Sequence, residues 1–255
     1  MMTRLTTVAG AVLGAIALLG GCSGTPPGEF IIVQNQVPAA DCTIPPTLGA
    51  IYRGHGILDV RLTVDGHGYQ LYPLLQNNFP PPSGQSVDAN RIALSGFDVD
   101  VDLPPDPPPG QIKDLITMYR AAADGSPELA LVHYGTLTSG SVASGGGNTA
   151  SSVEAFPSQL AQRIRDMGLL SAPNPNRYEV MTSVRARGDN LVGGVRSDAF
   201  KYPIELCDGC LLVDQGTCPV AAALGNSCAP GQDDGAVGCC TLSGSVVCPS
   251  VVASK

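Results

Sequence analysis

Cysteines gather at the C-terminal end of this 255-residue chain, and their placement limits what that end can fold into. Seven of the nine lie within 42 positions: Cys207, Cys210, Cys218, Cys228, Cys239, Cys240 and Cys248. A segment this short and rich in loops cannot bury a core of its own, so it depends on cross-links and on packing against a neighbour. We therefore expect residues 207–255 to form a small tail that leans on the last strand before it.

The first 22 residues have the parts of an export signal. Arg4 supplies a positive charge, residues 5–19 are apolar, and two glycines precede Cys22. The apolar run is short for a transmembrane helix, which needs roughly 20 residues. Because Cys22 directly follows Gly21, the segment resembles the lipobox of bacterial lipoproteins, which implies removal of residues 1–21 and attachment of diacylglycerol to the sulfur of Cys22. A transmembrane helix and a plain secretory signal are the weaker alternatives.

Export makes disulfides the first interpretation of the remaining cysteines. Without Cys22 the count is eight, and seven of these lie in the tail, so Cys42 pairs with one of the seven if every cysteine is bonded. On the chain-entropy model, so long a closed loop stabilises the protein by roughly 5 kcal/mol. Eight cysteines allow on the order of 100 pairings, and the sequence does not choose among them.

A zinc site is the rival interpretation of Cys207 and Cys210. Their CxxC spacing is half of a zinc ribbon, but the chain has no second CxxC at a matching distance. The three histidines, His55, His67 and His133, lie far from the cluster in sequence. A redox role for the CxxC would need a surrounding βαβ pattern, which is missing. We expect structural disulfides at all eight positions, with no metal ion and no cofactor.

The composition favours strands and turns over long helices. Only 14% of the residues are charged, whereas the chain has 31 glycines and 22 prolines. The formal net charge of −8 gives no basic surface for a nucleic acid or for anionic headgroups. These features exclude nucleic acid as a partner and leave the N-terminal lipid as the contact with a membrane.

Apolar and polar residues alternate in several short segments, which is the period of half-buried strands. The expected strands are 30–37, 57–64, 69–75, 90–94, 97–103, 129–137, 178–186 and 197–206. The turn at 65–68 predicts a hairpin between the second and third of these, and Pro73 places the third at an edge or a bulge. Helical spacing predicts short helices over 112–119 and 157–167. Together these segments predict a mainly β fold, an antiparallel, immunoglobulin-like β-sandwich with one or two short helices and a disulfide-bonded C-terminal tail.

The same patterns divide the chain into four parts. They are a signal peptide (1–21), the lipidated Cys22 with a polar linker (22–29), a β-sandwich domain (30–206) and the cysteine-rich tail (207–255). Residues 139–152 are expected to form a mobile or hairpin loop. This glycine-rich loop lacks the Gly-Lys-Ser/Thr of a phosphate-binding loop and the Gly-x-Ser-x-Gly of a nucleophile elbow.

Three carboxylates share the polar face of the segment 97–103. Asp98, Asp100 and Asp102 alternate there with apolar residues, so we expect them to point away from the core. They are the candidate cation site of the body. An EF-hand, however, would need a glycine and a glutamate where the chain has Leu103 and Pro109. We expect a solvated acidic face, with calcium as the alternative.

Three segments carry a further resemblance: IIVQNQVPAADC (31–42), YPIELCDGCLL (202–212) and CAPGQDDGAVGCC (228–240). They resemble a group of uncharacterised, cysteine-rich-tailed lipoproteins from myxobacteria and related bacteria. The resemblance implies secretion, lipidation and cysteine bridging, and it supplies no active-site residues. Ser23 follows Cys22 where an aspartate would favour retention in the inner membrane. We therefore expect the outer membrane, on its periplasmic face or at the cell surface.

No catalytic constellation stands out, so we expect a non-enzymatic envelope lipoprotein, a structural or protein-interaction module that contacts the membrane and an envelope protein. An enzyme would need a base, and His133 is the candidate that the pattern predicts to be least exposed. The alternative is a lipoprotein that binds a small molecule or glycan between loops, lined by Tyr69, Tyr72, Phe79 and the 139–152 loop. The absence of tryptophan weighs against a sugar-binding surface.

Overall fold

The computed structural model describes residues 28–62, 68–84, 87–171, 176–217, 228–229, 231–233, 235–242 and 245–247. The predictions for the leader, for Cys22 and for the linker up to residue 27 lie outside this part, as do Cys218, Cys248 and His67. The described part contains sixteen strands and two α-helices, which confirms the mainly β prediction. Neither helix has the length and apolar character needed to cross a bilayer.

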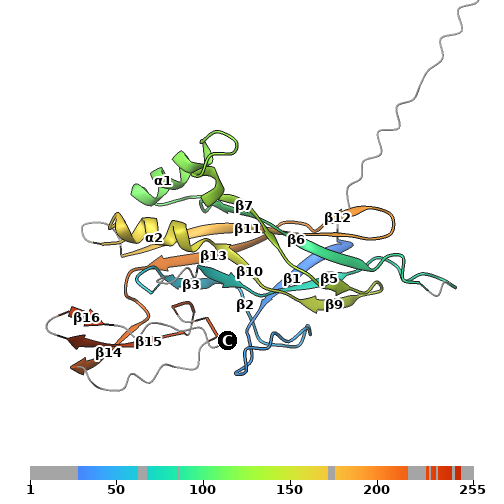
Figure 1. Ribbon diagram of the computed structural model, residues 1–255, viewed down its shortest axis with the longest axis horizontal. Coiled ribbons are helices and arrows are strands. Elements are labelled where there is room, and N and C mark those ends of the chain that lie inside the picture. Colours follow the sequence, from blue (N-terminus) through green and yellow to red (C-terminus); the bar gives the residue numbers. More distant parts are fainter. Residues whose placement is uncertain are drawn as a thin grey trace, which may run out of the picture.

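Seven strands form the larger sheet, in the order β3-β13-β11-β6-β7, with β12 beside β11 and β8 beside β6 (Figure 1). They are β3 (Gly56–Asp59), β6 (Ile92–Asp102), β7 (His133–Leu137), β8 (Ser141–Val142), β11 (Arg177–Asp189), β12 (Gly194–Arg196) and β13 (Phe200–Cys207). The predicted strands 90–94 and 97–103 are one continuous strand, β6. Its alternation is as expected, because Phe97, Val99 and Val101 are fully buried.

A smaller sheet has the order β2-β1-β5-β9, and β4 pairs separately with β10. These strands are β1 (Phe30–Gln36), β2 (Tyr52–Arg53), β4 (Tyr69–Leu71), β5 (Pro73–Asn77), β9 (Gly147–Ala150) and β10 (Val153–Phe156). Phe30 and Leu75 of this sheet share one buried cluster with Val99 and Val184 of the larger sheet, so the two sheets enclose a common core. Most pairings are antiparallel, and the immunoglobulin-like connectivity stays a prediction.

Both predicted helices are present. The first, α1 (Gln111–Arg120), buries the four residues whose spacing predicted it, Ile112, Leu115, Ile116 and Tyr119. The second, α2 (Ser158–Asp166), follows Pro157, whose extended backbone makes it the N-cap rather than a first-turn residue. Gly168 ends the helix in the left-handed region at φ +65°, as expected of a C-terminal glycine. The predicted helix includes Met167, but this residue is the C-cap of α2 and is exposed.

The predicted hairpin between 57–64 and 69–75 is wrong. β3 ends at Asp59 and pairs in parallel with β13, whereas β4 pairs with β10. The strand stops because the Asp59 carboxylate accepts the backbone N–H of Arg61 and turns the chain. Pro73 begins β5, which is paired on both sides, so of the two predicted positions the edge is wrong, whereas the pairing of β5 with β1 does have a bulge-like register shift near Pro73. A proline fits there because the first residue of a strand tolerates a missing N–H.

Only the second half of the expected strand 129–137 is extended. Leu129–Leu131 form a short 3-10 helix, η1, because the Ser126 hydroxyl accepts the N–H of Leu129 and starts a turn. The expected loop 139–152 contains β8 and β9, which pair with different sheets. Short pairings of this kind depend on partners far away in sequence, and the local pattern does not record them.

The tail adds three strands, β14 (Leu212–Thr217), β15 (Val237–Leu242) and β16 (Ser245–Val247), with β14 and β15 parallel. Its buried cluster joins Val237 and Cys239 to Leu62 of the body. Gln232 forms a bridge with Leu58 of β3. The tail thus shares its core with the body, as expected of a segment too small to bury its own.

Candidate functional site

A disulfide bond ties the tail to the N-terminal part of the chain. Cys42–Cys228 joins residues that are 186 apart in the sequence. Cys239 and Cys240 are disulfide-bonded as well. The expected bond from Cys42 to the tail is therefore confirmed, and it fixes the loop after β1 against the segment before β15.

The CxxC segment lies against a buried carboxylate. Cys207 and Cys210 are bonded to each other, and their sulfurs and an oxygen of Asp59 all lie within 4.8 Å of one another. Asp59 accepts the backbone N–H of Gly209 at 2.8 Å and that of Leu211 at 2.9 Å. Burial raises the pKa of Asp59, and these donors oppose the shift. The group has the spacing of a metal site, but its sulfurs form a disulfide and its carboxylate holds the loop, which favours a structural role over zinc.

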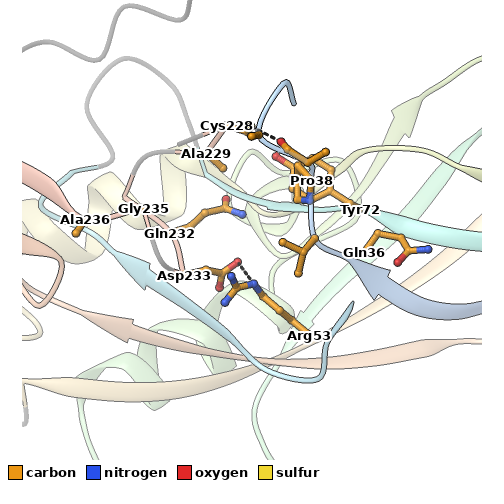
Figure 2. A pocket seen from close by; sticks show the side chains of 13 residues that line it. Gln36, Pro38, Arg53, Tyr72, Cys228, Ala229, Gln232, Asp233, Gly235 and Ala236 are labelled. Atoms are coloured by element: carbon orange, nitrogen blue, oxygen red, sulfur yellow. Dashed lines mark hydrogen bonds and ion pairs between the residues drawn. The ribbon is translucent and has the colours of Figure 1, made fainter. Parts of the chain in front are cut away.

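A pocket of about 250 Å³ lies where the tail crosses the N-terminal segment, and we call it the junction pocket (Figure 2). The body contributes Gln36, Val37, Pro38, Ala39, Ala40, Arg53 and Tyr72, and the tail contributes Cys228, Ala229, Gln232, Asp233, Gly235 and Ala236. Because one wall comes from each segment, the pocket exists only while the tail is docked on the body.

Asp233 anchors the tail side of the junction pocket. It exchanges two hydrogen bonds with Ile57 of β3, since its N–H donates to the Ile57 carbonyl and the Ile57 N–H donates to its carboxylate at 3.0 Å. Arg53 pairs with the same carboxylate at 3.6 Å (Figure 2). The neighbouring Gln232 exchanges two hydrogen bonds with the backbone of Gln70 in β4. These contacts hold the tail on two strands of the body.

Buried side chains continue this network into the core. Tyr69 donates to the Asp233 carboxylate at 3.1 Å, and the hydroxyls of Tyr69 and Tyr202 are 3.0 Å apart. Tyr69 has one hydroxyl proton and the carboxylate is the stronger acceptor, so Tyr202 donates to Tyr69. Asn35 donates to Tyr202 at 2.9 Å and accepts the backbone N–H of Tyr72 at 2.8 Å. Burial raises the pKa of both buried tyrosines, so they remain protonated donors at neutral pH.

Tyr72 is a polar residue that the body presents to the pocket alongside Arg53 and Gln36. Burial, and after it the charge of Asp233, raises the pKa of the Tyr72 hydroxyl. No hydrogen bond of this hydroxyl is found within the described part of the chain, whereas the Gln36 side chain is engaged by Gln34 and by the Thr47 carbonyl. The pocket therefore offers a neutral phenol beside an ion pair, an arrangement suited to binding a small polar group.

The residues predicted to line a ligand site are dispersed. Tyr72 reaches the junction pocket, but Tyr69 is fully buried beneath it and Phe79 packs against the core. The 139–152 loop forms strands elsewhere. Conversely, Arg53 lines the pocket without any signal in the sequence.

The tail residues of the pocket were also missed. Gln232 and Asp233 lie inside the segment CAPGQDDGAVGCC, which carries part of the lipoprotein resemblance. The resemblance implies only a cross-linking role for that segment. The signal in the sequence for Gln232 and Asp233 is that they are polar residues in a glycine-rich loop between Cys228 and Cys239.

The carboxylates of β6 point away from the core, as expected, and on that outer face they form a ladder of ion pairs. The carboxylate of Asp98 pairs with Arg196 and with Arg187, whose nitrogen lies 3.0 Å away. The carboxylate of Asp100 lies 3.5 Å from a nitrogen of Arg185 and 2.6 Å from the ring of His133. The carboxylate of Asp102 lies 3.4 Å from a nitrogen of Arg120. Every candidate calcium ligand thus has a cationic partner. His133, which the pattern predicts to be the least exposed histidine, is 60% exposed, because it lies on the outer face of the edge strand β7.

The chain matches no protein-family model, no curated protein and no solved structure. The lipobox and the likeness to myxobacterial lipoproteins therefore stay predictions.

Proposed function

We propose that this protein is an exported, lipid-anchored component of the bacterial cell envelope that serves as a structural or protein-interaction module. The observation that carries the proposal is the Cys42–Cys228 disulfide, which joins segments 186 residues apart. Disulfides of this kind form and persist in oxidising compartments. The export signal accounts for the route to such a compartment, and the lipobox at Cys22 supplies the anchor.

The docking of the tail supports a binding role. The disulfide prevents the tail from separating, and the contacts of Gln232 and Asp233 fix its orientation on β3 and β4. The two segments together present one surface of fixed shape, which lowers the ordering cost of recognising a partner. The outer membrane is the expected location, given Ser23 after the lipidated cysteine.

The anchor is tested by the change Cys22→Ser in the full-length chain. Lipid chains contribute about 0.8 kcal/mol per buried methylene, so their loss removes the membrane attachment. We expect the wild-type protein in the outer-membrane fraction and the variant in the soluble envelope fraction, measured by cell fractionation and immunoblotting. Thr25→Ala is the matched control and should stay with the membrane. A Cys22→Ser protein that still fractionates with membranes would contradict the proposal.

The junction pocket favours a second candidate function, the binding of a small polar molecule. The Tyr72 hydroxyl and the Arg53–Asp233 ion pair face a space of about 250 Å³. That volume lies below the range of about 300–1,000 Å³ that is usual for drug-sized ligands, so the occupant is small.

This second candidate is tested by titrating monosaccharides and free amino acids into the protein and following the NMR signals of the pocket residues. Tyr72→Phe removes one hydrogen-bonding group and keeps the ring, so we expect affinity to fall roughly tenfold. Tyr52→Phe, at an exposed tyrosine outside the pocket lining, is the control. If no probe shifts the pocket signals, the ligand-binding candidate fails and the interaction-module proposal remains.

A further inference from the structure

Exposed aliphatic side chains gather at the end of the body where β11 turns into β12. Leu191 and Val192 form the tip of this hairpin and are 74% and 87% exposed. Val87, also exposed, lies on the neighbouring loop. The N–H of Leu191 donates to the carbonyl of Ala89 at 3.2 Å, which holds that loop and the hairpin together. We call Val87, Leu191 and Val192 the apolar tip.

The chain enters the body at this same end. The N–H of Gly28 donates to the carboxylate of Asp198 at 3.2 Å, and Asp198 follows β12 by two residues. Asn78 donates its side-chain amide to the Gly28 carbonyl at 2.9 Å and its backbone N–H to the Glu29 carbonyl at 2.6 Å. Asp198 is six positions from Val192 in the sequence, so the backbone that holds Gly28 lies within about 21 Å of the apolar tip.

The tail lies on the other side of the molecule. In Figure 1 the chain enters the body at the upper right, beside β12, whereas β14, β15 and β16 occupy the lower left and β2 lies below the sheets. Ile51, which precedes β2, is another strongly exposed aliphatic residue, and its carbonyl accepts the N–H of Val37, which lines the junction pocket.

We propose that the apolar tip rests in the headgroup region of the membrane and orients the body with the junction pocket turned away from the bilayer. The inference depends on the lipid anchor proposed above. Cys22 is six residues from Gly28, a separation that spans at most about 20 Å. A tether this short keeps the apolar tip at high effective concentration near the lipid surface.

The charges around the apolar tip indicate an apolar rather than an electrostatic contact. Asp88 is engaged by the amide and hydroxyl of Ser144 and pairs with Arg91, while Arg187 and Arg196 of the β11–β12 hairpin both pair with Asp98. Among the described residues, these cations are thus balanced by carboxylates, which weakens any attraction to anionic lipids. The contact should accordingly persist at high salt concentration.

The test uses tryptophan, because the chain contains none and one introduced residue reports alone. Full-length lipidated Val192→Trp is reconstituted into phosphatidylethanolamine–phosphatidylglycerol vesicles whose acyl chains carry bromine. We expect its emission to shift to shorter wavelength and to be quenched by the bromine, at both low and high salt. Ile51→Trp is the matched control and should keep the emission of a water-exposed ring. Both substitutions replace exposed side chains, so neither disturbs the core.

Each other outcome overturns the inference. Unquenched emission from Val192→Trp protein that floats with the vesicles shows an anchored body whose apolar tip is free of lipid. Equal quenching in the two variants shows that the body has no fixed orientation, and quenching in Ile51→Trp alone shows the opposite orientation. Protein that does not float with vesicles refutes the anchor itself, so failure of the proposed function is distinguished from failure of the orientation.

Discussion

Tyr69 reaches Asp233 because residue 56 has no side chain. A Cβ atom built at Gly56 would lie 2.5 Å from the ring of Tyr69. That ring is fully buried, so it cannot move aside without breaking its hydrogen bonds to Asp233 and Tyr202. Gly54, two residues earlier, has nothing within 4 Å of the same position. The network that docks the tail therefore depends on one glycine in β3.

We expect Gly56→Ala to lower the free energy of unfolding by about 1–3 kcal/mol, the usual cost of forcing an extra carbon into a packed core. Gly54→Ala is the matched control and should change stability by less than about 1 kcal/mol. Urea denaturation of the two variants measures the difference. Equal losses in both would show that the Tyr69 ring does not limit the space at position 56.

Asp208 gives the protein a dependence on acidic pH with a definite sign. The side chain of Arg61 donates to it at 2.7 Å and lowers the pKa of Asp208 from the ordinary value of 3.8. The unfolded chain therefore binds this proton first, and the stabilisation is present above pH 3.8 and lost as the pH falls through the folded pKa. The pair is partly exposed, so we expect about 0.5–1 kcal/mol.

Asp208→Asn removes this contribution. Wild type should exceed the variant in stability by a constant amount above about pH 5, and the difference should shrink as the pH falls below 3.8. Guanidinium denaturation from pH 2 to 6 measures it, with Asp106→Asn, at an exposed position, as the control. A difference that stays constant down to the lowest pH would refute the role of the carboxylate charge.

The residues of the junction pocket could not be derived from sequence, because their roles depend on distant partners. Tyr69 is an aromatic residue of the kind expected to line a ligand site, yet its hydroxyl donates to the carboxylate of Asp233, 164 positions away. Arg53 lies in a two-residue strand with no periodic pattern, and its ion pair with Asp233 exists only once the tail has docked. Local patterns in the sequence predict which residues are buried and where the chain turns, but they do not identify such distant partners.

Among the elements, long strands and helices were predictable where one face is buried over many residues. The strand β6 and the helix α1 follow this rule, since a period of two or of 3.6 residues repeats along them. The segment 69–77 was not predictable, because the chain changes sheets at Tyr72 and divides into β4 and β5. The apolar run Leu71–Leu75 crosses that change without a break, so a single strand and a strand that switches sheets look alike in the sequence.

The ion pairs on the outer face of β6 differ in how much they stabilise the protein. Asp98 faces two guanidinium groups, and the Nε of Arg187 is buried with that carboxylate 3.0 Å away. We expect Asp98→Asn to cost about 1–2 kcal/mol, because two guanidinium groups lose the carboxylate they face and one of them has its Nε buried beside it. Asp102→Asn, at the more exposed rung with Arg120, should cost about 0–1 kcal/mol. Thermal unfolding of the two variants at low and high salt measures the loss of stability in each. Equal losses would show that the burial of Asp98 does not strengthen its ion pairs.

At the scale of the whole molecule, the number of cysteines predicts a bond between distant segments that the hydrophobic pattern does not indicate. Seven cysteines in the tail are an odd number, which is why Cys42 had to reach across the chain. The choice of Cys228 could not be made, because it depends on how the tail crosses the loop after β1. The bond and the docking contacts of Asp233 lie on the same junction, so the body and the tail are joined both covalently and by hydrogen bonds.

The double change Cys42→Ser with Cys228→Ser separates these two attachments. The disulfide closes a loop over 186 residues, so its loss should cost about 5 kcal/mol, against about 2 kcal/mol for Cys207→Ser with Cys210→Ser. Denaturant unfolding measures both, and comparable losses would refute the chain-entropy account. If the variant without the Cys42–Cys228 bond unfolds in a single transition, the hydrogen bonds of Asp233 still couple the tail to the body. Two units that unfold separately would give two transitions. Two transitions would instead support division of the chain near residue 206 and would place the disulfide as the main link across the junction pocket.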